Sequence, residues 1–140
     1  MSELFSISWP HWEKTIEAKL LDKQAGALLK AFWDSIPSTS IQSHASCAGY
    51  QLYCPYKLVY PPEDLYFEPM NKQKLGRINL EPDFQYLSIN YNTMEEPVPA
   101  LPIAQVEEQY LQEIETIGKM AWDNLLFSND FIKVVFQKIE

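Results

Sequence analysis

The segment "AKLLDKQAGALLKAFWDSIPSTSIQSHASCAGYQLY", residues 18–53, decides the fold because its hydrophobic period changes twice. Its first four residues end an alternating, strand-like segment. Apolar residues then recur at the spacing of a one-sided helix, with Asp22 as the candidate N-cap and Pro37 as the stop. These apolar positions are Ala25, Leu28, Leu29, Phe32 and Trp33. β-Branched and aromatic residues follow, so the segment predicts strand, helix, strand.

The flanking residues extend this pattern on both sides. On the N-terminal side, residues 4–9 and 14–21 predict two strands joined by a turn at Pro10–Glu13, because proline is tolerated at turns and not inside a sheet. On the C-terminal side, residues 38–56 predict a strand pair. Gly49 interrupts this pair and is a candidate turn or bulge.

The second half of the chain alternates between irregular and regular patterns. Residues 60–83 are rich in proline and polar groups, which predicts a long excursion with one or two short extended pieces. The regular elements expected after it are a clear strand at 84–92, a short strand at 103–108 beyond a proline-rich connector, a helix at 106–126 and a last strand at 130–140.

This order of elements favours one architecture. Strands outnumber helices, and no regular alternation of strand and helix indicates a parallel sheet. A closed antiparallel barrel with two helices accommodates about seven strands economically, because closure removes the exposed edges. At 140 residues the chain has the length of one domain, so we expect residues 1–140 to form a single domain of the mainly β class with α.

Composition and charge exclude several function classes. The net charge is −8, and the 11 basic residues are scattered, so a nucleic-acid surface is not expected. The first residues lack the pattern of a signal peptide, and no apolar run has the length of a membrane span. Cys47 and Cys54 are six residues apart without a second Cys/His pair, so we expect no metal site and interpret them as reduced thiols in a cytoplasmic protein. A redox or structural disulfide is the alternative.

Three stretches together resemble a known family. They are residues 18–53, "LEPDFQYLSINYN" (80–92), and "LPIAQV" (101–106) with the following helix and the strand "IKVVFQKI" (132–139). Their order is similar to that of small bacterial cyclophilin-like barrel proteins, in the group that includes the cucumopine and mikimopine synthases. The chain departs from the family pattern at Pro82-Asp83, which lacks a glycine, at Tyr91-Asn92 in place of Tyr-Gly, and near Ile103, where an asparagine is missing.

The resemblance implies an opine-synthase-like enzyme. Such an enzyme condenses an amino acid such as histidine with a 2-oxo acid such as 2-oxoglutarate, through a Pictet–Spengler-like ring closure that needs no redox cofactor. In agreement, the chain carries no glycine-rich dinucleotide fingerprint. The resemblance also points to a homodimer. The alternative is a non-catalytic, small-molecule-binding barrel, and prolyl isomerase activity is not implied because the arginine, glutamine and aromatic constellation of true cyclophilins is missing.

Ring closure needs an acid that expels water, a base that removes the ring proton, and groups that hold carboxylates. His44 is the strongest acid/base candidate because its unperturbed pKa lies near neutrality. On a regular strand it shares a face with Gln42 and Ser46. The catalytic candidates are therefore His44 and Tyr53, and the substrate-binding candidates are Ser46, Tyr50, Arg77 and Tyr91. A hydrogen-bonded structural histidine, core tyrosines and a solvated arginine are the alternatives, and convergence on one pocket distinguishes the two interpretations.

Overall fold

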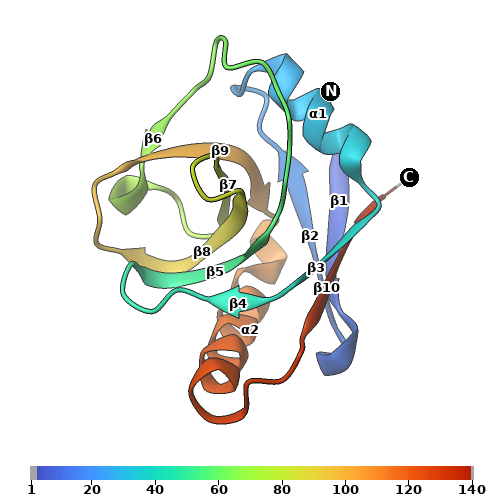
Figure 1. Ribbon diagram of the computed structural model, residues 1–140, viewed down its shortest axis with the longest axis vertical. Coiled ribbons are helices and arrows are strands. Elements are labelled where there is room, and N and C mark those ends of the chain that lie inside the picture. The colour runs from blue at the N-terminus through green and yellow to red at the C-terminus, as the bar shows by residue number, and fades with distance from the viewer. Residues whose placement is uncertain (1–2, 140) are drawn as a thin grey trace.

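Antiparallel strands and two α-helices make up most of the computed structural model, which describes residues 3–139 (Figure 1). Three single turns of 3₁₀ helix occupy Pro10–Trp12, Met70–Lys72 and Glu108–Tyr110, and a π-helical turn, Asn124–Ser128, continues α2. The strands are β1 (Leu4–Trp9), β2 (Lys14–Leu20), β3 (Ser38–Ile41), β4 (Ser43–His44), β5 (Gly49–Pro55), β6 (Glu68–Pro69), β7 (Arg77–Glu81), β8 (Tyr86–Met94), β9 (Pro99–Val106) and β10 (Lys133–Lys138), and the helices are α1 (Gly26–Ser35) and α2 (Leu111–Asp123).

The sheet curls into a nearly closed barrel. Its strand order is β3-β10-β1-β2-β9-β7-β8-β5-β4, every pair is antiparallel, and β6 adds a short pair to β9. The two ends of this order, β3 and β4, are separated in the chain only by Gln42. One continuous segment therefore joins both edges of the sheet, which confirms the predicted antiparallel barrel with two helices.

Gln42 fastens this junction. Its backbone N–H donates to the carbonyl of Ile132 at 2.7 Å, and its side-chain Oε1 accepts from the indole N–H of Trp9 at 2.9 Å. On the other side, its Nε2 donates to the carbonyls of Ser43 and Tyr53. A buried side-chain amide whose polar groups all have hydrogen-bond partners is strongly held. Gln42 therefore fixes the position of β4, and with it the position of His44.

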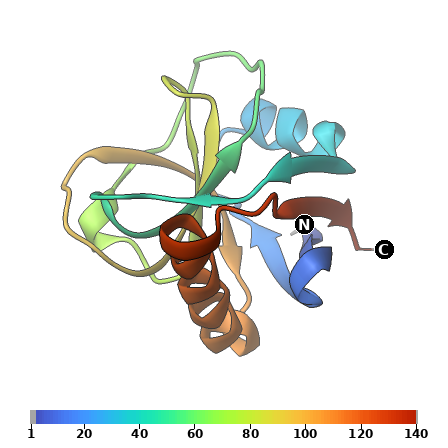
Figure 2. The ribbon, with the colours of Figure 1, turned by 60° about the horizontal axis from the view of Figure 1, so that its bottom comes forward.

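The core lies inside the barrel and is closed by the helices at opposite ends of the molecule (Figures 1 and 2). Alternating residues of β1 and β2 face inward, as their period of two requires. Helix α2 packs on β4, β5 and β8. The largest fully buried side chains include Phe5, Ile7, Trp9, Ile16, Leu28, Phe32, Leu52, Ile78, Leu87, Leu101, Ile103 and Phe136.

Several predicted boundaries differ from the structure. Helix α1 begins at Gly26 and its N-cap residue is Ala25, so the prediction of Asp22 as N-cap is wrong. The cause lies in Gln24, whose buried amide bonds to the carbonyls of Tyr66 and Pro102 and whose Oε1 accepts from the N–H of Ala25. These bonds hold the preceding residues in a non-helical path.

The proline-rich connector predicted at 93–102 is shorter than expected. Strand β8 continues to Met94 and β9 already begins at Pro99, because the first residues of β9 pair with β6 and β7. The turn at Pro10–Glu13 and the bulge at Gly49 are confirmed: the strand register shifts between Gly49 and Gln51, and Gly49 has a φ of +135°. Glu140, the end of the last predicted strand, lies outside the described residues.

Candidate functional site

A pocket of about 270 Å³ lies where β4, the start of β5 and the end of β8 meet α2. It is formed by residues from three separate stretches of the chain, 44–50, 91–95 and 119–122, which the fold brings together. The lining residues are His44, Ala45, Ser46, Cys47, Gly49, Tyr50, Tyr91, Glu95, Lys119 and Trp122. Four of the six site residues predicted from the sequence are among them.

His44 lies against the inner wall of this pocket and is only 4% exposed. Its Nδ1 is 2.6 Å from the carbonyl oxygen of Ala45, and its Nε2 is 2.7 Å from the hydroxyl of Tyr91. A carbonyl can only accept a hydrogen bond, so Nδ1 carries the proton and Tyr91 donates to Nε2. Burial lowers the pKa of His44, although the bond to Ala45 opposes this. The imidazole is therefore a neutral base that faces a hydroxyl.

Tyr91 is the proton donor of this pair. Its ring is buried, and burial raises its pKa to about 12, with smaller contributions from Tyr50 and Glu115. The phenol therefore stays protonated at neutral pH. Its hydroxyl connects the pocket to His44 Nε2, which makes the Tyr91–His44 pair a short path for a proton between a bound molecule and the imidazole.

Aromatic rings surround the pair. The centroid of the His44 ring lies 4.9 Å from that of Trp122 and 5.5 Å from that of Tyr91. Tyr50 contacts Tyr91 edge-on, with ring centroids 5.9 Å apart, and is 52% exposed, so part of it is accessible to a ligand. Walls of this kind suit a planar, partly polar ring.

One side chain of each charge also lines the pocket. Glu95 comes from the residues after β8, and Lys119 comes from α2. The Lys119 side chain is 73% exposed, and its ammonium lies 3.7 Å from the Glu115 carboxylate one turn earlier, a weak surface pair. An anion and a cation at one aromatic pocket match the two charges of an amino acid.

Gly118 allows α2 to approach this pocket closely. A Cβ atom built at Gly118 would lie 2.2 Å from a ring carbon of Tyr91, far inside van der Waals contact. The glycine therefore sets the distance between α2 and β8. It places Trp122, one helical turn later, over His44.

The other two predicted residues lie elsewhere. Tyr53 stacks on Tyr86 with ring centroids 4.7 Å apart and does not line the pocket. Arg77 forms a bidentate pair with Glu68, through Nε at 2.8 Å and Nη2 at 2.7 Å, and its Nη1 donates to Gln105. The structure thus brings His44, Ser46, Tyr50 and Tyr91 together and separates Tyr53 and Arg77 from them.

The Arg77–Glu68 pair belongs to a buried polar network on the outer face of β7 and β8. Arg77 lowers the pKa of Glu68 to about 2, so this carboxylate stays ionised at every ordinary pH. Both side chains are largely covered, at 14% and 13% exposure. The network continues through Gln73, Asn79, Asn90 and Gln51. In this arrangement Arg77 fastens the long 60–76 segment to the sheet.

Glu95, Lys119 and Trp122 were not predicted as site residues. The apolar stripe of α2 describes the side of the helix that faces the core and says nothing about the side that faces the pocket. Lys119 and Trp122 are three residues apart and so share a helix face. That spacing is the signal that could have paired them.

Cysteine and metal-ligand chemistry add no further site in the part of the chain that the structure describes. Within residues 3–139 both cysteines are free: Cys54 is buried, and burial raises its pKa to about 12, whereas Cys47 is exposed at the pocket. No group of three or more His, Cys, Asp or Glu side chains in this range is arranged to hold a metal ion. The helices in the same range are all too short or too polar to cross a membrane.

Comparison with known proteins finds similarity in structure only. No family model and no curated protein sequence matches the chain. The structure of McbB in complex with tryptophan is similar, with a TM-score of 0.83 and 23% identity, over 95% of this chain and 44% of that one. A hypothetical protein from Archaeoglobus fulgidus has a TM-score of 0.55 and 11% identity, over 99% of this chain and 95% of its own. These similarities support the cyclophilin-like barrel fold, and this chain spans less than half the length of McbB.

Proposed function

We propose that the protein condenses an amino acid, such as histidine, with a 2-oxo acid, such as 2-oxoglutarate, in the His44 pocket. The observation that carries the proposal is the hydrogen-bonded His44–Tyr91 pair inside an aromatic pocket that also holds Lys119 and Glu95. The similarity to McbB supports an amino acid as one substrate, because that structure is in complex with tryptophan.

In this proposal, different pocket residues bind different groups of the substrate. The half-exposed Tyr50 and the ring of Trp122 hold the planar side chain of the amino acid. The Lys119 ammonium binds a carboxylate, and Glu95 accepts hydrogen bonds from the amino group. The hydroxyl of Ser46 is a further donor at the pocket edge. Tyr53 and Arg77, which lie outside the pocket, take no part in this proposal.

The Tyr91–His44 pair moves the protons. The amino group first gives a proton through the Tyr91 hydroxyl to His44 Nε2, and the amine then attacks the keto carbon. The pair returns this proton to the hydroxyl of the carbinolamine, which leaves as water and forms an iminium ion. The imidazole ring carbon of the substrate attacks the iminium carbon. His44 finally takes the proton from that ring carbon through Tyr91, which restores the aromatic ring, and releases it to solvent.

This sequence balances without oxidation or reduction. One C–N bond and one C–C bond form, the C=O bond breaks, and one water leaves. It starts from neutral His44, which is the form that burial favours. The carbonyl of Ala45 bonds Nδ1–H throughout and stabilises the imidazolium when it forms.

The test is direct. The protein is incubated with histidine and 2-oxoglutarate, and mass spectrometry follows a product with the summed mass minus one water. Because an open imine has the same mass, a borohydride-treated aliquot separates it from the ring-closed product, which resists reduction. We expect formation faster than in a protein-free control. A rate equal to that control with histidine, tryptophan and other amino acids would reject condensation as the function.

One observation favours the alternative of a binding barrel without catalysis. Both ring nitrogens of His44 already have partners inside the protein, as in a structural histidine. In that case the protein binds the amino acid and shows no turnover above the protein-free rate. The sequence-based expectations of a cytoplasmic, single-domain protein remain predictions.

A further inference from the structure

An exposed apolar surface lies where α2 ends and the chain turns back into β10. It consists of Ile41, Leu125, Leu126, Phe127 and Phe131, which we call the seam surface because it borders the junction of β3 and β4. Phe127 and Phe131 are 80% and 82% exposed. Ile41, Leu125 and Phe131 line one hollow, and apolar side chains gathered on a protein surface usually mark an interaction site.

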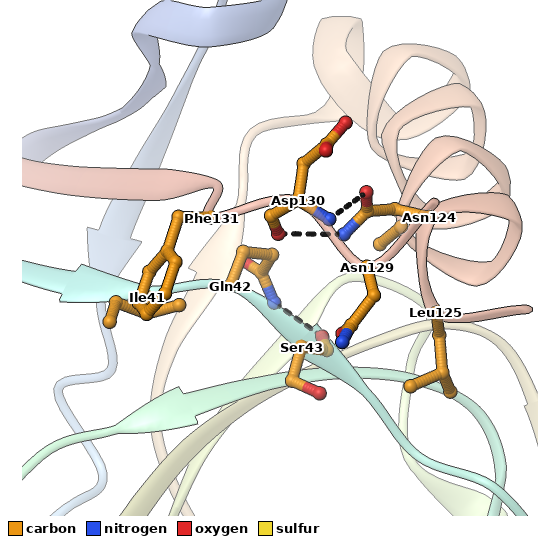
Figure 3. A pocket seen from close by; sticks show the side chains of 9 residues that line it. Ile41, Gln42, Ser43, Asn124, Leu125, Asn129, Asp130 and Phe131 are labelled. Carbon is orange, nitrogen blue, oxygen red and sulfur yellow. Dashed lines mark hydrogen bonds between the residues drawn. The ribbon is translucent and has the colours of Figure 1, made fainter. Parts of the chain in front are cut away.

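Two hollows flank Phe131 on this surface. The first, of about 270 Å³, lies between Ile41 and Phe131 on one side and Leu125 on the other (Figure 3). The second, of about 400 Å³, is lined by Ile41, Pro55 and Phe131 among others. The surface therefore carries a projecting aromatic ring and adjacent concavities large enough for a side chain.

The turn between residue 128 and β10 holds Phe131 in its exposed position. Asn124 accepts a hydrogen bond from the N–H of Asp130 at 2.9 Å and donates to its carbonyl at 3.1 Å (Figure 3). Asn129 adopts the left-handed conformation, with a φ of +60°, and Ile132 is buried in the core. With Phe131 fixed between these anchors, a partner would meet a preorganised side chain.

The charges beside the two hollows have opposite signs. Asp130 lines the first hollow and Lys133 lines the second. Neither forms an ion pair with another residue in the range 3–139. In a two-fold arrangement the same patch faces itself in reverse, so Asp130 of one copy can face Lys133 of the other. A surface that offers a projecting ring, adjacent hollows and both charges is complementary to itself.

We propose that the seam surface binds a second copy of this chain. Each Phe131 inserts into a hollow of the other copy, and Asp130 and Lys133 pair across the two-fold axis. Aromatic side chains in such central positions dominate interface energies. Binding of a second copy at the seam surface does not depend on the chemistry proposed for the His44 pocket.

The experiment measures the molar mass of the protein by sedimentation equilibrium over about a hundredfold range of concentration. We expect a monomer–dimer equilibrium. Phe131→Asp should raise the dissociation constant at least about 30-fold, since a central aromatic anchor contributes about 2 kcal/mol or more. The matched control is Val59→Asp, which places the same charge at a 95% exposed apolar residue that lines neither hollow, and it should leave the dissociation constant unchanged.

A charge exchange tests the two-fold pairing without altering Phe131. Asp130→Lys should weaken the dimer, and adding Lys133→Asp should restore it, because the reversed pair has the same attraction. Circular dichroism confirms that each variant is folded. A monomer at every concentration, a dimer that tolerates Phe131→Asp, or a double variant as weak as Asp130→Lys would overturn the proposal.

Discussion

Replacement of His44 by alanine is expected to lower the rate of condensation by at least about 100-fold, because general acid–base groups contribute factors of about 100 to 10,000. His44 is the only described imidazole at the pocket and accepts the Tyr91 proton directly. The measurement is the steady-state rate of ring-closed product by mass spectrometry.

His44→Gln is the control that separates a chemical from a structural role. The glutamine amide oxygen can accept the Tyr91 hydrogen bond but cannot take up a proton. We therefore expect His44→Gln to be as inactive as His44→Ala while it unfolds at a urea concentration closer to that of the wild type. If His44→Gln is instead more active than His44→Ala to the extent that it is more stable, the role of His44 is structural.

The pH dependence of the wild type follows from the direction of the His44 shift. Burial lowers the His44 pKa below 6.5, so the neutral base persists at pH 6.5 and is lost only as the pH falls through the lowered pKa. In consequence, kcat/KM should decrease on the acidic side with a midpoint below 6.5. NMR titration of the His44 ring should give the same midpoint, and a midpoint above 6.5 would contradict the assignment.

Gly118→Ala is expected to destabilise the protein by about 1–3 kcal/mol, the usual cost of overpacking a tight contact. In an exposed helix the same change would stabilise by up to about 1 kcal/mol. Here the change in the free energy of unfolding is destabilising, because the new Cβ would lie 2.2 Å from the buried Tyr91 ring and one of them must move. Displacement of Tyr91 breaks its bond to His44, so the condensation rate should fall as well.

Urea unfolding measures the loss of stability in Gly118→Ala, with Gly26→Ala as the matched variant. At Gly26, the first residue of α1, a Cβ meets nothing within 4 Å, so Gly26→Ala should leave stability unchanged or raise it. Adding Tyr91→Leu to Gly118→Ala should cost less than the sum of the two single changes, because the smaller side chain relieves the contact. Equal effects of Gly118→Ala and Gly26→Ala would show that the close approach is unimportant.

Much of the fold could be predicted from local pattern. The changes of hydrophobic period around residues 22–37 locate α1, and the alternation in residues 4–9 locates β1. The barrel closure could be predicted only in outline, because Gln42 joins Trp9, Ile132 and Tyr53, which are distant in the sequence. No local pattern reveals which strands such an amide connects.

The candidate site, like the fold, could be predicted from the sequence only in part. His44 and Ser46 could be grouped from the two-residue period of a strand, and the Gly49 bulge brings Tyr50 to the same pocket. Tyr53 is three residues from Tyr50, so on a regular strand it belongs to the opposite face, which argues against grouping the two. The partner of Arg77 could not be predicted, because the path of the long excursion decides that Glu68 reaches it.

Binding of the amino acid in the His44 pocket is tested most directly by NMR titration of the labelled protein with histidine, followed by 2-oxoglutarate. The signals to follow are the indole N–H of Trp122, the ring of His44 and the guanidinium N–H of Arg77. We predict saturable shifts of Trp122 and His44 with Arg77 unchanged, since Arg77 is bound to Glu68 outside the pocket. Shifts confined to Arg77 and its neighbours, or none at saturating substrate, would contradict the assignment of this pocket.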